Sequence, residues 1–78
     1  MLQNCGLVTP SPAVVAAIRR LVVREGLIPT CSLLGVSRAT VDRLRGGALP
    51  VHRGTYLVVL AALAPIDPAV RTTQESTP

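Results

Sequence analysis

The chain has 78 residues, which is the size of one small domain, and a chain this short buries only about 60% of the surface that it exposes when unfolded. Nearly half of the residues are apolar, yet Tyr56 is the only aromatic residue, so the core must be built from aliphatic side chains, which favours helices. The eight basic residues are all arginine, and they give a net charge of +4. This charge is compatible with an anionic partner, but arginines also keep small domains soluble, so their positions must decide.

Several classes of protein are not expected from the residue content. Cys5 and Cys31 are too few for a disulfide framework, and with the single His52 they do not form a metal-ligand spacing. The first residues lack the basic segment and the long apolar run of a secretory signal. The apolar run 57–64 would be only about 12 Å long as a helix, too short to cross a membrane. We therefore expect a cytoplasmic protein with reduced thiols, no metal and no cofactor.

The N-terminal half of the chain predicts an arm and then a helix. Residues 1–10 have no clear hydrophobic period and are expected to be an N-terminal arm. A helix is predicted over 12–25, because Ser11 can cap its first turn, a proline is tolerated at its first position, and Gly26 can end it in a left-handed conformation. Apolar residues at helical spacing are expected to face the core: Val14, Ile18, Leu21 and Val22.

Two shorter helices are predicted in the middle of the chain. The first covers residues 29–34, since a proline suits a helix start, and Gly35 ends it. Ser37 is a strong candidate to cap the second, which covers 38–45 and ends at the glycine pair 46–47.

A fourth helix is predicted near the C-terminal end. Residues 48–54 contain a proline and a glycine and are interpreted as a loop. Thr55 can cap a helix over 56–64, which a proline then ends. Residues 65–78 have few large apolar side chains and are predicted to be a mobile C-terminal tail, in which a short fifth helix is possible. Residues 11–64 then form the folded domain.

The third predicted helix has two faces of different character. Val36, Val41 and Leu44 form an apolar stripe that is expected to be buried, and the small Cys31 is expected where the two short helices approach each other. A second set of side chains then points outward: Arg38, Ala39, Asp42 and Arg43. The major groove of B-DNA, about 12 Å wide, accommodates a helix that presents such a face at its N-terminal end.

Residues 12–64 resemble the lambda-repressor-like DNA-binding domains, a group that includes phage repressors, Cro and Xre-type regulators. The resemblance is strongest between Cys31 and Arg45, where a small residue, Gly-Val-Ser, valine and leucine follow the family spacing, and GVSRATV is similar to Lac-type headpieces. A full helix before and after this segment is more similar to the phage-repressor and Xre arrangement. The resemblance implies an all-α, compact bundle of four or five helices that contains a helix-turn-helix, binds an operator and forms a symmetric dimer.

The resemblance also implies roles for individual side chains. Base contacts are implied for Arg38, Ala39 and Arg43, of which the arginines can each donate two hydrogen bonds to guanine. Ser37 and Thr40 are expected to contact phosphates and to position the helix. In the family, a polar residue that opens the second helix often contacts phosphate; here that position lies near Leu27, and Thr30 or Ser32 is a possible replacement. Further phosphate contacts are expected from Arg45 and Arg53, for which a solvated charge is the alternative.

Two polar side chains leave their roles open. Asp42 can accept a hydrogen bond from cytosine, or it can pair with Arg38 or Arg45, and we favour the internal pair. His52 precedes the last helix, where the family often contacts the DNA backbone, but a solvated side chain is the simpler interpretation.

The last predicted helix suggests an interface. Residues 56–64 are apolar on all sides, although packing on the other helices can bury only one side. If Leu57, Leu60, Ala61 and Ala64 face the core, a second copy is expected to contact the remaining large side chains: Tyr56, Val59 and Leu63. The alternative is that the N-terminal arm or the C-terminal tail covers this side in a monomer.

The sequence therefore predicts a small transcriptional regulator, a repressor that binds a palindromic operator in double-stranded DNA as a homodimer. Two alternatives are a non-catalytic helical module that binds protein and an accessory DNA-binding factor in recombination or excision. An enzyme is not expected, because the chain has no evident pair of nucleophile and base and no phosphate-binding loop.

Overall fold

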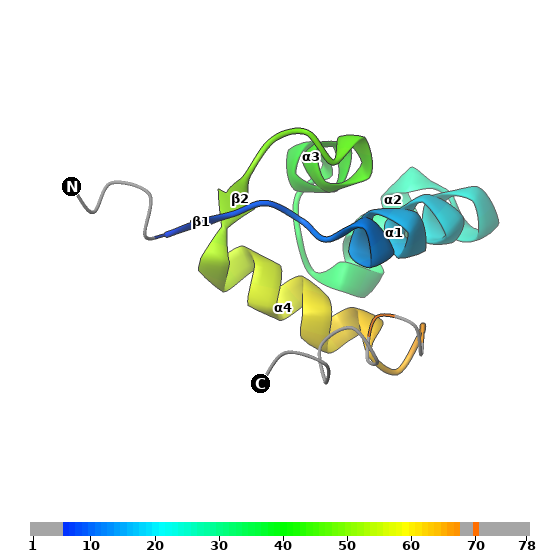
Figure 1. Ribbon diagram of the computed structural model, residues 1–78. Helices are drawn as coiled ribbons and strands as arrows, with labels where there is room; N and C mark the ends of the chain where they lie inside the picture. The colour runs from blue at the N-terminus through cyan, green and yellow to red at the C-terminus, as the bar shows by residue number, and fades with distance from the viewer. Residues whose placement is uncertain (1–5, 68–69, 71–78) are drawn as a thin grey trace.

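A computed structural model describes residues 6–67 and residue 70 of the chain. The described part is mostly helical and has a short two-stranded sheet at one end (Figure 1). In chain order the elements are β1 (Leu7–Val8), α1 (Pro12–Glu25), α2 (Leu27–Leu34), α3 (Arg38–Gly46), β2 (Val51–His52) and α4 (Arg53–Leu63).

Helix α1 has the predicted bounds and the predicted cap. The Ser11 hydroxyl accepts a hydrogen bond from the Val14 amide at 3.3 Å, which satisfies one of the free amides of the first turn. Gly26 ends the helix, and its amide donates to the Val22 carbonyl at 2.8 Å. The glycine has a positive φ of 96° but a ψ of 163°, so it is not in the left-handed helical conformation that we expected.

Helix α2 begins at Leu27, two residues before the predicted start. Pro29 is therefore the third helical residue, where a missing amide proton removes no intrahelical hydrogen bond. Gly26 serves as the N-cap of α2 while it ends α1, so the two helices follow each other without a loop. Gly35 ends α2 in the left-handed conformation, with a φ of 72°.

Helix α3 begins where the sequence predicts and ends at Gly46, one residue later than predicted. The Ser37 hydroxyl accepts from the Thr40 amide at 3.2 Å, and Gly47 follows the last turn in the left-handed conformation, with a φ of 76°. A Cβ atom at Gly47 would lie 3.2 Å from a methyl group of Val15, so the end of α3 lies close against α1.

The two strands were not predicted, and the expectation of an all-helical fold is wrong in this detail. β1 and β2 are antiparallel, with Leu7 opposite His52 and Val8 opposite Val51. The Arg53 amide also donates to the Gly6 carbonyl at 2.6 Å. The second half of the predicted arm is therefore attached to the domain, and residues 1–5 lie outside the described residues.

Helix α4 begins at Arg53, three residues before the predicted start, and it ends at Leu63. The prediction that Thr55 caps it is wrong, because Thr55 is the third helical residue and His52 occupies the cap position in an extended conformation. β2 thus continues directly into α4, and the predicted loop over 48–54 is shorter than expected.

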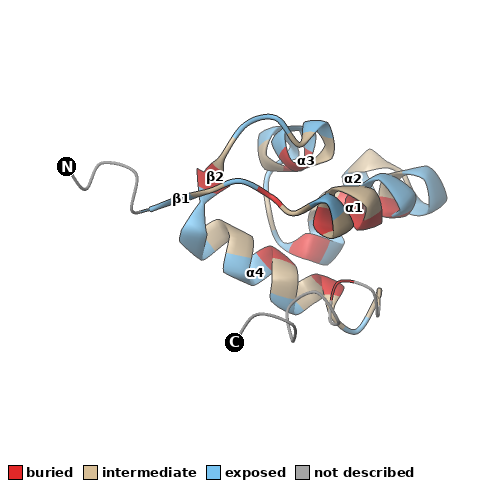
Figure 2. Ribbon diagram, viewed as in Figure 1, coloured by how far each residue is buried: buried red, intermediate tan, exposed pale blue. Residues whose placement is uncertain are grey.

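The core lies between α1, α2, α3 and α4, on the sides that these helices turn toward one another (Figure 2). Val22 and Val36, which were expected to be buried, are only partly buried and pack at the edge of the core. The buried apolar residues are Val14, Ala17, Ile18, Leu21, Leu34, Val41, Leu44, Val51, Val59, Leu63 and Val70.

The predicted orientation of α4 is wrong. Val59 and Leu63, which were expected to contact a second copy, are completely buried in the monomer. Tyr56 is partly buried, and its hydroxyl accepts a hydrogen bond from the Ser11 amide at 3.0 Å. Leu57, which was expected in the core, is instead 52% exposed. The predicted dimer interface is therefore inside the domain.

Two described residues that follow α4, Asp67 and Val70, are attached to the domain. The Val70 side chain is completely buried, and its amide donates to the Asp67 carbonyl at 3.1 Å. Asp67 also forms an ion pair with Arg20 of α1. The prediction of a mobile tail from residue 65 is thus wrong for these residues, and residues 71–78 lie outside the described part.

Candidate functional site

The turn between α2 and α3 holds the two helices at a fixed angle. The amides of Gly35 and Val36 both donate to the Cys31 carbonyl, at 2.8 Å and 3.2 Å. On either side of the turn, Leu34 and Val41 are buried in the same core. Cys31 is partly buried and packs against that core, as the sequence suggested. The turn and the buried side chains together fix which face of α3 points outward.

The outward face of α3 carries the four side chains that the sequence placed there. Arg38, Ala39, Asp42 and Arg43 are all exposed. The side of α3 opposite this face is held in the core by Val41 and by Leu44.

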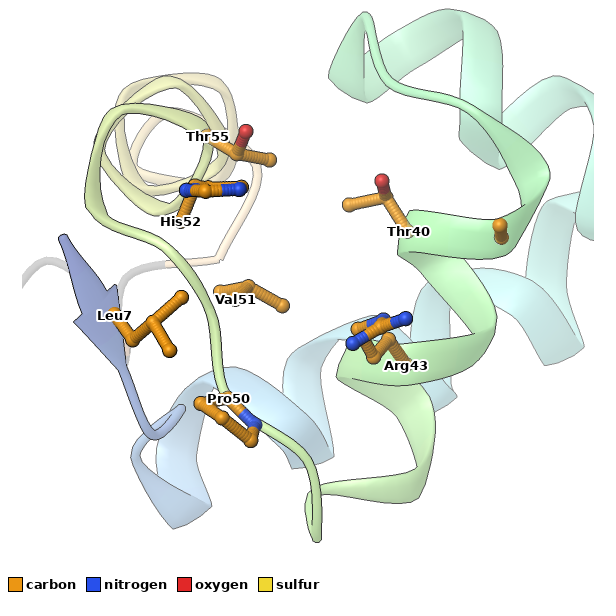
Figure 3. Close-up of a pocket in the computed structure, with 8 residues that line it drawn as sticks. Leu7, Thr40, Arg43, Pro50, Val51, His52 and Thr55 are labelled. Atoms are coloured by element: carbon orange, nitrogen blue, oxygen red, sulfur yellow. The ribbon is translucent and has the colours of Figure 1, made fainter. Parts of the chain in front are cut away.

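A groove separates α3 from β2 and the first turn of α4 (Figure 3). Thr40 and Arg43 lie on the α3 side of this groove, and His52 and Thr55 lie on the opposite side, with Val51 between them. The groove has a volume of about 280 Å³. Its lining contains no carboxylate and consists of Leu7, Ala39, Thr40, Arg43, Pro50, Val51, His52 and Thr55.

Four of the described arginines form a side-chain hydrogen bond or an ion pair within the protein, and we call these tied arginines. Those that form neither are called untied. Arg19 donates to the Arg45 carbonyl at 2.9 Å, and three ion pairs join Arg20 to Asp67, Arg24 to Glu25 and Arg45 to Asp42. Within residues 6–67 and 70, no side-chain hydrogen bond or ion pair holds the remaining three, which are Arg38, Arg43 and Arg53.

The three untied arginines are concentrated around the groove. Arg43 lines it, Arg38 lies five residues earlier at the start of α3, and Arg53 directly follows the groove residue His52. The tied arginine Arg24, by comparison, lies in the last turn of α1. The positive charge that remains available for an anionic ligand is therefore concentrated on one part of the surface.

The structure separates the side chains predicted to contact phosphate. Thr30 is completely buried and its hydroxyl donates to the Gly26 carbonyl at 2.6 Å, so this prediction is wrong. Ser32 is exposed on α2. Ser37 and Thr40 lie together at the start of α3, with their hydroxyl oxygens 3.1 Å apart. Ser32, Ser37 and Thr40 therefore remain candidates.

Two further residues have defined surroundings. Asp42 accepts a hydrogen bond from the Arg45 guanidinium at 2.8 Å, which confirms the internal pair that we favoured. Arg45 was predicted to bind phosphate, but in the structure its guanidinium is already paired with Asp42. His52 is exposed and lines the groove, so its side chain lies where a ligand in the groove would meet it.

The sequence did not indicate that Thr55 belongs to the candidate site. Its side chain lies on the groove wall only because β1 pairs with β2 and α4 begins at once afterwards. Leu7 lines the groove for the same reason, although it is 44 residues from Val51 in the sequence. No local pattern in the sequence marks this juxtaposition.

Other kinds of site find no support in the described residues. No group of three histidine, cysteine, aspartate or glutamate side chains lies close enough together there to hold a metal ion. Within the same residues, no helix is long and apolar enough to cross a membrane. Comparisons of the chain with protein-family models, curated proteins and solved structures found no match.

Proposed function

We propose that this protein binds double-stranded DNA in a sequence-specific manner and acts as a small transcriptional regulator, with α2, the turn and α3 as a helix-turn-helix. The single observation that carries the proposal is the position of the untied arginines. Arg38, Arg43 and Arg53 all border the exposed face of α3 and the adjacent groove. A polyanion with regularly spaced phosphates suits this arrangement better than a small anion does.

Helix α3 is the proposed recognition helix. One face of α3 is exposed and carries Arg38, Ala39 and Arg43, while the opposite face is buried. In the major groove, each arginine can donate two hydrogen bonds to guanine O6 and N7, worth about 1–3 kcal/mol of discrimination against another base. Ala39 can contact a thymine methyl group and contributes less.

The groove is the proposed place for the DNA backbone that flanks the major groove. Thr40 offers a hydroxyl from the α3 side, and His52 and Thr55 offer an imidazole and a hydroxyl from the other side. Arg53 adds a positive charge beside them. Such contacts fix the register of the protein on the duplex and carry no sequence information of their own.

Repression is the regulatory role that this arrangement supports best. A bound domain that covers a major-groove segment can exclude other proteins from overlapping sites, and it needs no further activity to do so. Activation requires a second contact with the transcription machinery, and recombination requires assembly with other factors. We therefore propose operator binding as the primary activity.

The direct test is a selection from random duplexes with the full chain, followed by binding measurements over a range of salt concentrations. We expect a preferred site, and an affinity that falls by about 0.9 log unit per log unit of salt for each phosphate neutralised. An affinity that does not change with salt contradicts DNA binding and favours a protein partner instead.

A matched pair of arginine variants localises the interface. We expect Arg43→Ala to cost about 1–3 kcal/mol on the preferred site and to relax its sequence preference. Arg24→Ala removes the same charge from the last turn of α1, where the side chain already pairs with Glu25, and should change the affinity little. Equal losses for the two variants contradict the assignment of the interface to α3.

A further inference from the structure

Contact with a DNA backbone leaves half of the groove lining without a use. Four of the eight lining residues are apolar, and three segments of the chain supply them: Leu7, Ala39, Pro50 and Val51. Val51 is only 5% exposed and lies between the two walls of the groove (Figure 3). A phosphate is bound by charge and by hydrogen-bond donors and gains nothing from apolar neighbours. The apolar lining indicates a ligand that buries an apolar part of its own against it.

The other half of the lining can donate hydrogen bonds. Among the described residues that line the groove, Arg43 is the only one with a permanent charge. In the described part of the chain, no hydrogen bond engages the side chains of Arg43, His52 or Thr55. The Thr40 hydroxyl lies 3.1 Å from the Ser37 hydroxyl, and when Ser37 donates in this pair the Thr40 proton is free for a ligand. One guanidinium, two hydroxyls and one imidazole are therefore available to a single bound group.

The size and the charge of the groove narrow the class of ligand. Its volume of about 280 Å³ lies just below the range of about 300–1,000 Å³ that is typical of pockets for small molecules, so the ligand is small. A guanidinium fits a carboxylate well, because it donates two parallel hydrogen bonds to the two oxygens. A phosphate monoester has almost twice that charge at neutral pH, and Arg43 alone does not offset it. The apolar walls are aliphatic, so an aliphatic body matches them best.

The segments outside the described residues do not supply this ligand. Residues 1–5 have the sequence Met-Leu-Gln-Asn-Cys, which contains no acidic side chain and cannot neutralise Arg43. Residues 68–69 and 71–78 contain one acidic side chain, Glu75, but no large apolar group that could also fill the apolar lining. None of these segments combines a carboxylate with a large apolar group, and all of them are present to compete in the tests below.

We propose that the groove binds a small aliphatic monocarboxylate and that this ligand competes with DNA. The carboxylate accepts hydrogen bonds from Arg43 and from the hydroxyls on the two walls, and the apolar part lies on Val51 and Leu7. Only the competition rests on the proposed function, because the ligand site does not depend on DNA. The ligand meets one of the three untied arginines, so Arg38 and Arg53 keep their proposed role toward the polyanion.

The competition follows from the position of Arg43. The same guanidinium is proposed to read a guanine, and a bound carboxylate holds it in the groove instead. The ligand also fills the space beside Thr40 that the DNA backbone is proposed to enter. Its negative charge repels phosphates at close range. A protein loaded with the ligand should therefore bind its operator more weakly, and DNA should weaken the binding of the ligand by the same factor.

The first test is a titration of the full chain, without DNA, with cyclohexanecarboxylate at constant ionic strength, followed through the backbone amide signals in NMR spectra. We expect saturable shifts at Thr40, at Arg43 and over residues 51–55, with a Kd on the order of 1 mM. Acetate has the charge without the apolar body, and cyclohexylmethanol has the body without the charge. Each should therefore bind at least about tenfold more weakly.

Three results of this titration overturn the proposal. If acetate or inorganic phosphate binds as well as cyclohexanecarboxylate does, the groove accepts any anion. If no saturable shift is seen up to about 20 mM, roughly twenty times the expected Kd, the groove binds no such ligand. If cyclohexanecarboxylate binds only after Leu2→Ser and Glu75→Gln are introduced together, a segment of the chain occupies the groove in place of a ligand.

Two matched pairs of variants locate the bound cyclohexanecarboxylate. We expect Arg43→Gln to weaken its binding about tenfold or more, whereas Arg38→Gln, on the same exposed face but outside the groove, should change the affinity less than about twofold. Leu7→Ala should weaken binding about fivefold, and Leu49→Ala, which shortens the exposed leucine that precedes Pro50, should not. Circular dichroism checks that each variant is folded. Equal effects within either pair contradict this location of the ligand.

The last measurement separates the ligand site from the proposed function. On the preferred duplex we expect cyclohexanecarboxylate, at about ten times its Kd, to lower the apparent affinity of the chain about tenfold, with sodium chloride as the ionic-strength control. If the chain binds cyclohexanecarboxylate but no DNA, the proposed function fails and the ligand site stands. If it binds DNA but not cyclohexanecarboxylate, the ligand site fails and DNA binding stands. If it binds both and neither affects the other, the competition is wrong.

Discussion

The carboxylate of Asp42 and the guanidinium of Arg45 lie 2.8 Å apart, three residues from each other on α3. Their side chains are 46% and 40% exposed, so the pair contributes little to stability. Its effect on the surface is larger, because Asp42 is the only acidic residue on α3 and the pair offsets its charge. The exposed face of α3 can then present Arg38 and Arg43 to an anionic ligand without a competing free carboxylate.

The first prediction concerns this pair. We expect Asp42→Asn to strengthen DNA binding by about fivefold, since it removes a negative charge near the phosphates and frees Arg45, a gain of about 1 kcal/mol for one exposed charge. The dependence on salt should steepen by about 0.9 log unit if Arg45 then reaches a phosphate. Fluorescence anisotropy at several salt concentrations measures both quantities.

The control for this prediction is Glu25→Gln. It removes the same charge and releases Arg24 in the same way, but at the end of α1. If both variants raise the affinity equally, the gain comes from the net charge alone. The claim that Asp42 acts through its position on α3 is then wrong.

The second prediction concerns the orientation of α4. Leu63 is completely buried and Leu57 is half exposed, although both belong to the apolar segment 56–63 of α4. We expect Leu63→Ala to lower the free energy of unfolding by about 2–5 kcal/mol, because it leaves a cavity in the core. Leu57→Ala should change it by less than about 0.5 kcal/mol in the monomer. Urea denaturation at low protein concentration compares them, and similar losses for the two variants would mean that α4 is rotated.

The ends of the first three helices could largely be predicted because local chemistry marks them. Ser11 and Ser37 each precede a helix and accept a hydrogen bond from an amide three residues later, and neither interaction depends on the rest of the fold. Gly35 and Gly47 end helices because they adopt a positive φ without steric cost. The outward face of α3 was also predictable, since its polar residues alternate with apolar ones at helical spacing.

The orientation of α4 and the groove could not be predicted, for two physical reasons. A helix with apolar side chains all round has a strong tendency to be buried but no polar side to show which face is outward. The prediction therefore placed Leu57 in the core and Val59 on the outside, whereas the structure buries Val59 and exposes Leu57. The strands are two residues long and pair across more than forty positions, so neither has an alternating pattern. Because Leu7 pairs with His52, α4 begins directly after this pair, at Arg53. This start places His52 and Thr55 on the wall of the groove.

The third prediction concerns the hydrogen bond between the Tyr56 hydroxyl and the Ser11 amide, which spans 45 positions at 3.0 Å. We expect Tyr56→Phe to lower the free energy of unfolding by about 0.5–1.5 kcal/mol, since it leaves the amide of a partly buried residue without its acceptor. Thermal or urea unfolding measures the change. An unaltered stability would mean that solvent replaces the tyrosine at this amide.

The fourth prediction separates the two glycines that follow one another at the end of α3. Gly47 has a φ of 76°, and an added Cβ would lie 3.2 Å from a Val15 methyl group of α1. We expect Gly47→Ala to lower the free energy of unfolding by more than about 1 kcal/mol, because the left-handed conformation and the contact both oppose it. Gly46 is the last helical residue, has open space around it and does not have a positive φ.

Gly46→Ala is therefore the matched control, and it should be neutral or stabilise the protein by up to about 1 kcal/mol, because alanine restricts the unfolded chain more than glycine does. Since Gly47 lies where α3 meets α1, Gly47→Ala should also weaken DNA binding by moving the exposed face of α3 relative to the groove. Unfolding and anisotropy measurements on both variants test the two effects separately. If Gly47→Ala is as stable as Gly46→Ala, the close approach of α3 to α1 at Val15 is wrong. If Gly47→Ala is destabilised but binds the preferred duplex normally, the angle of α3 does not depend on this contact.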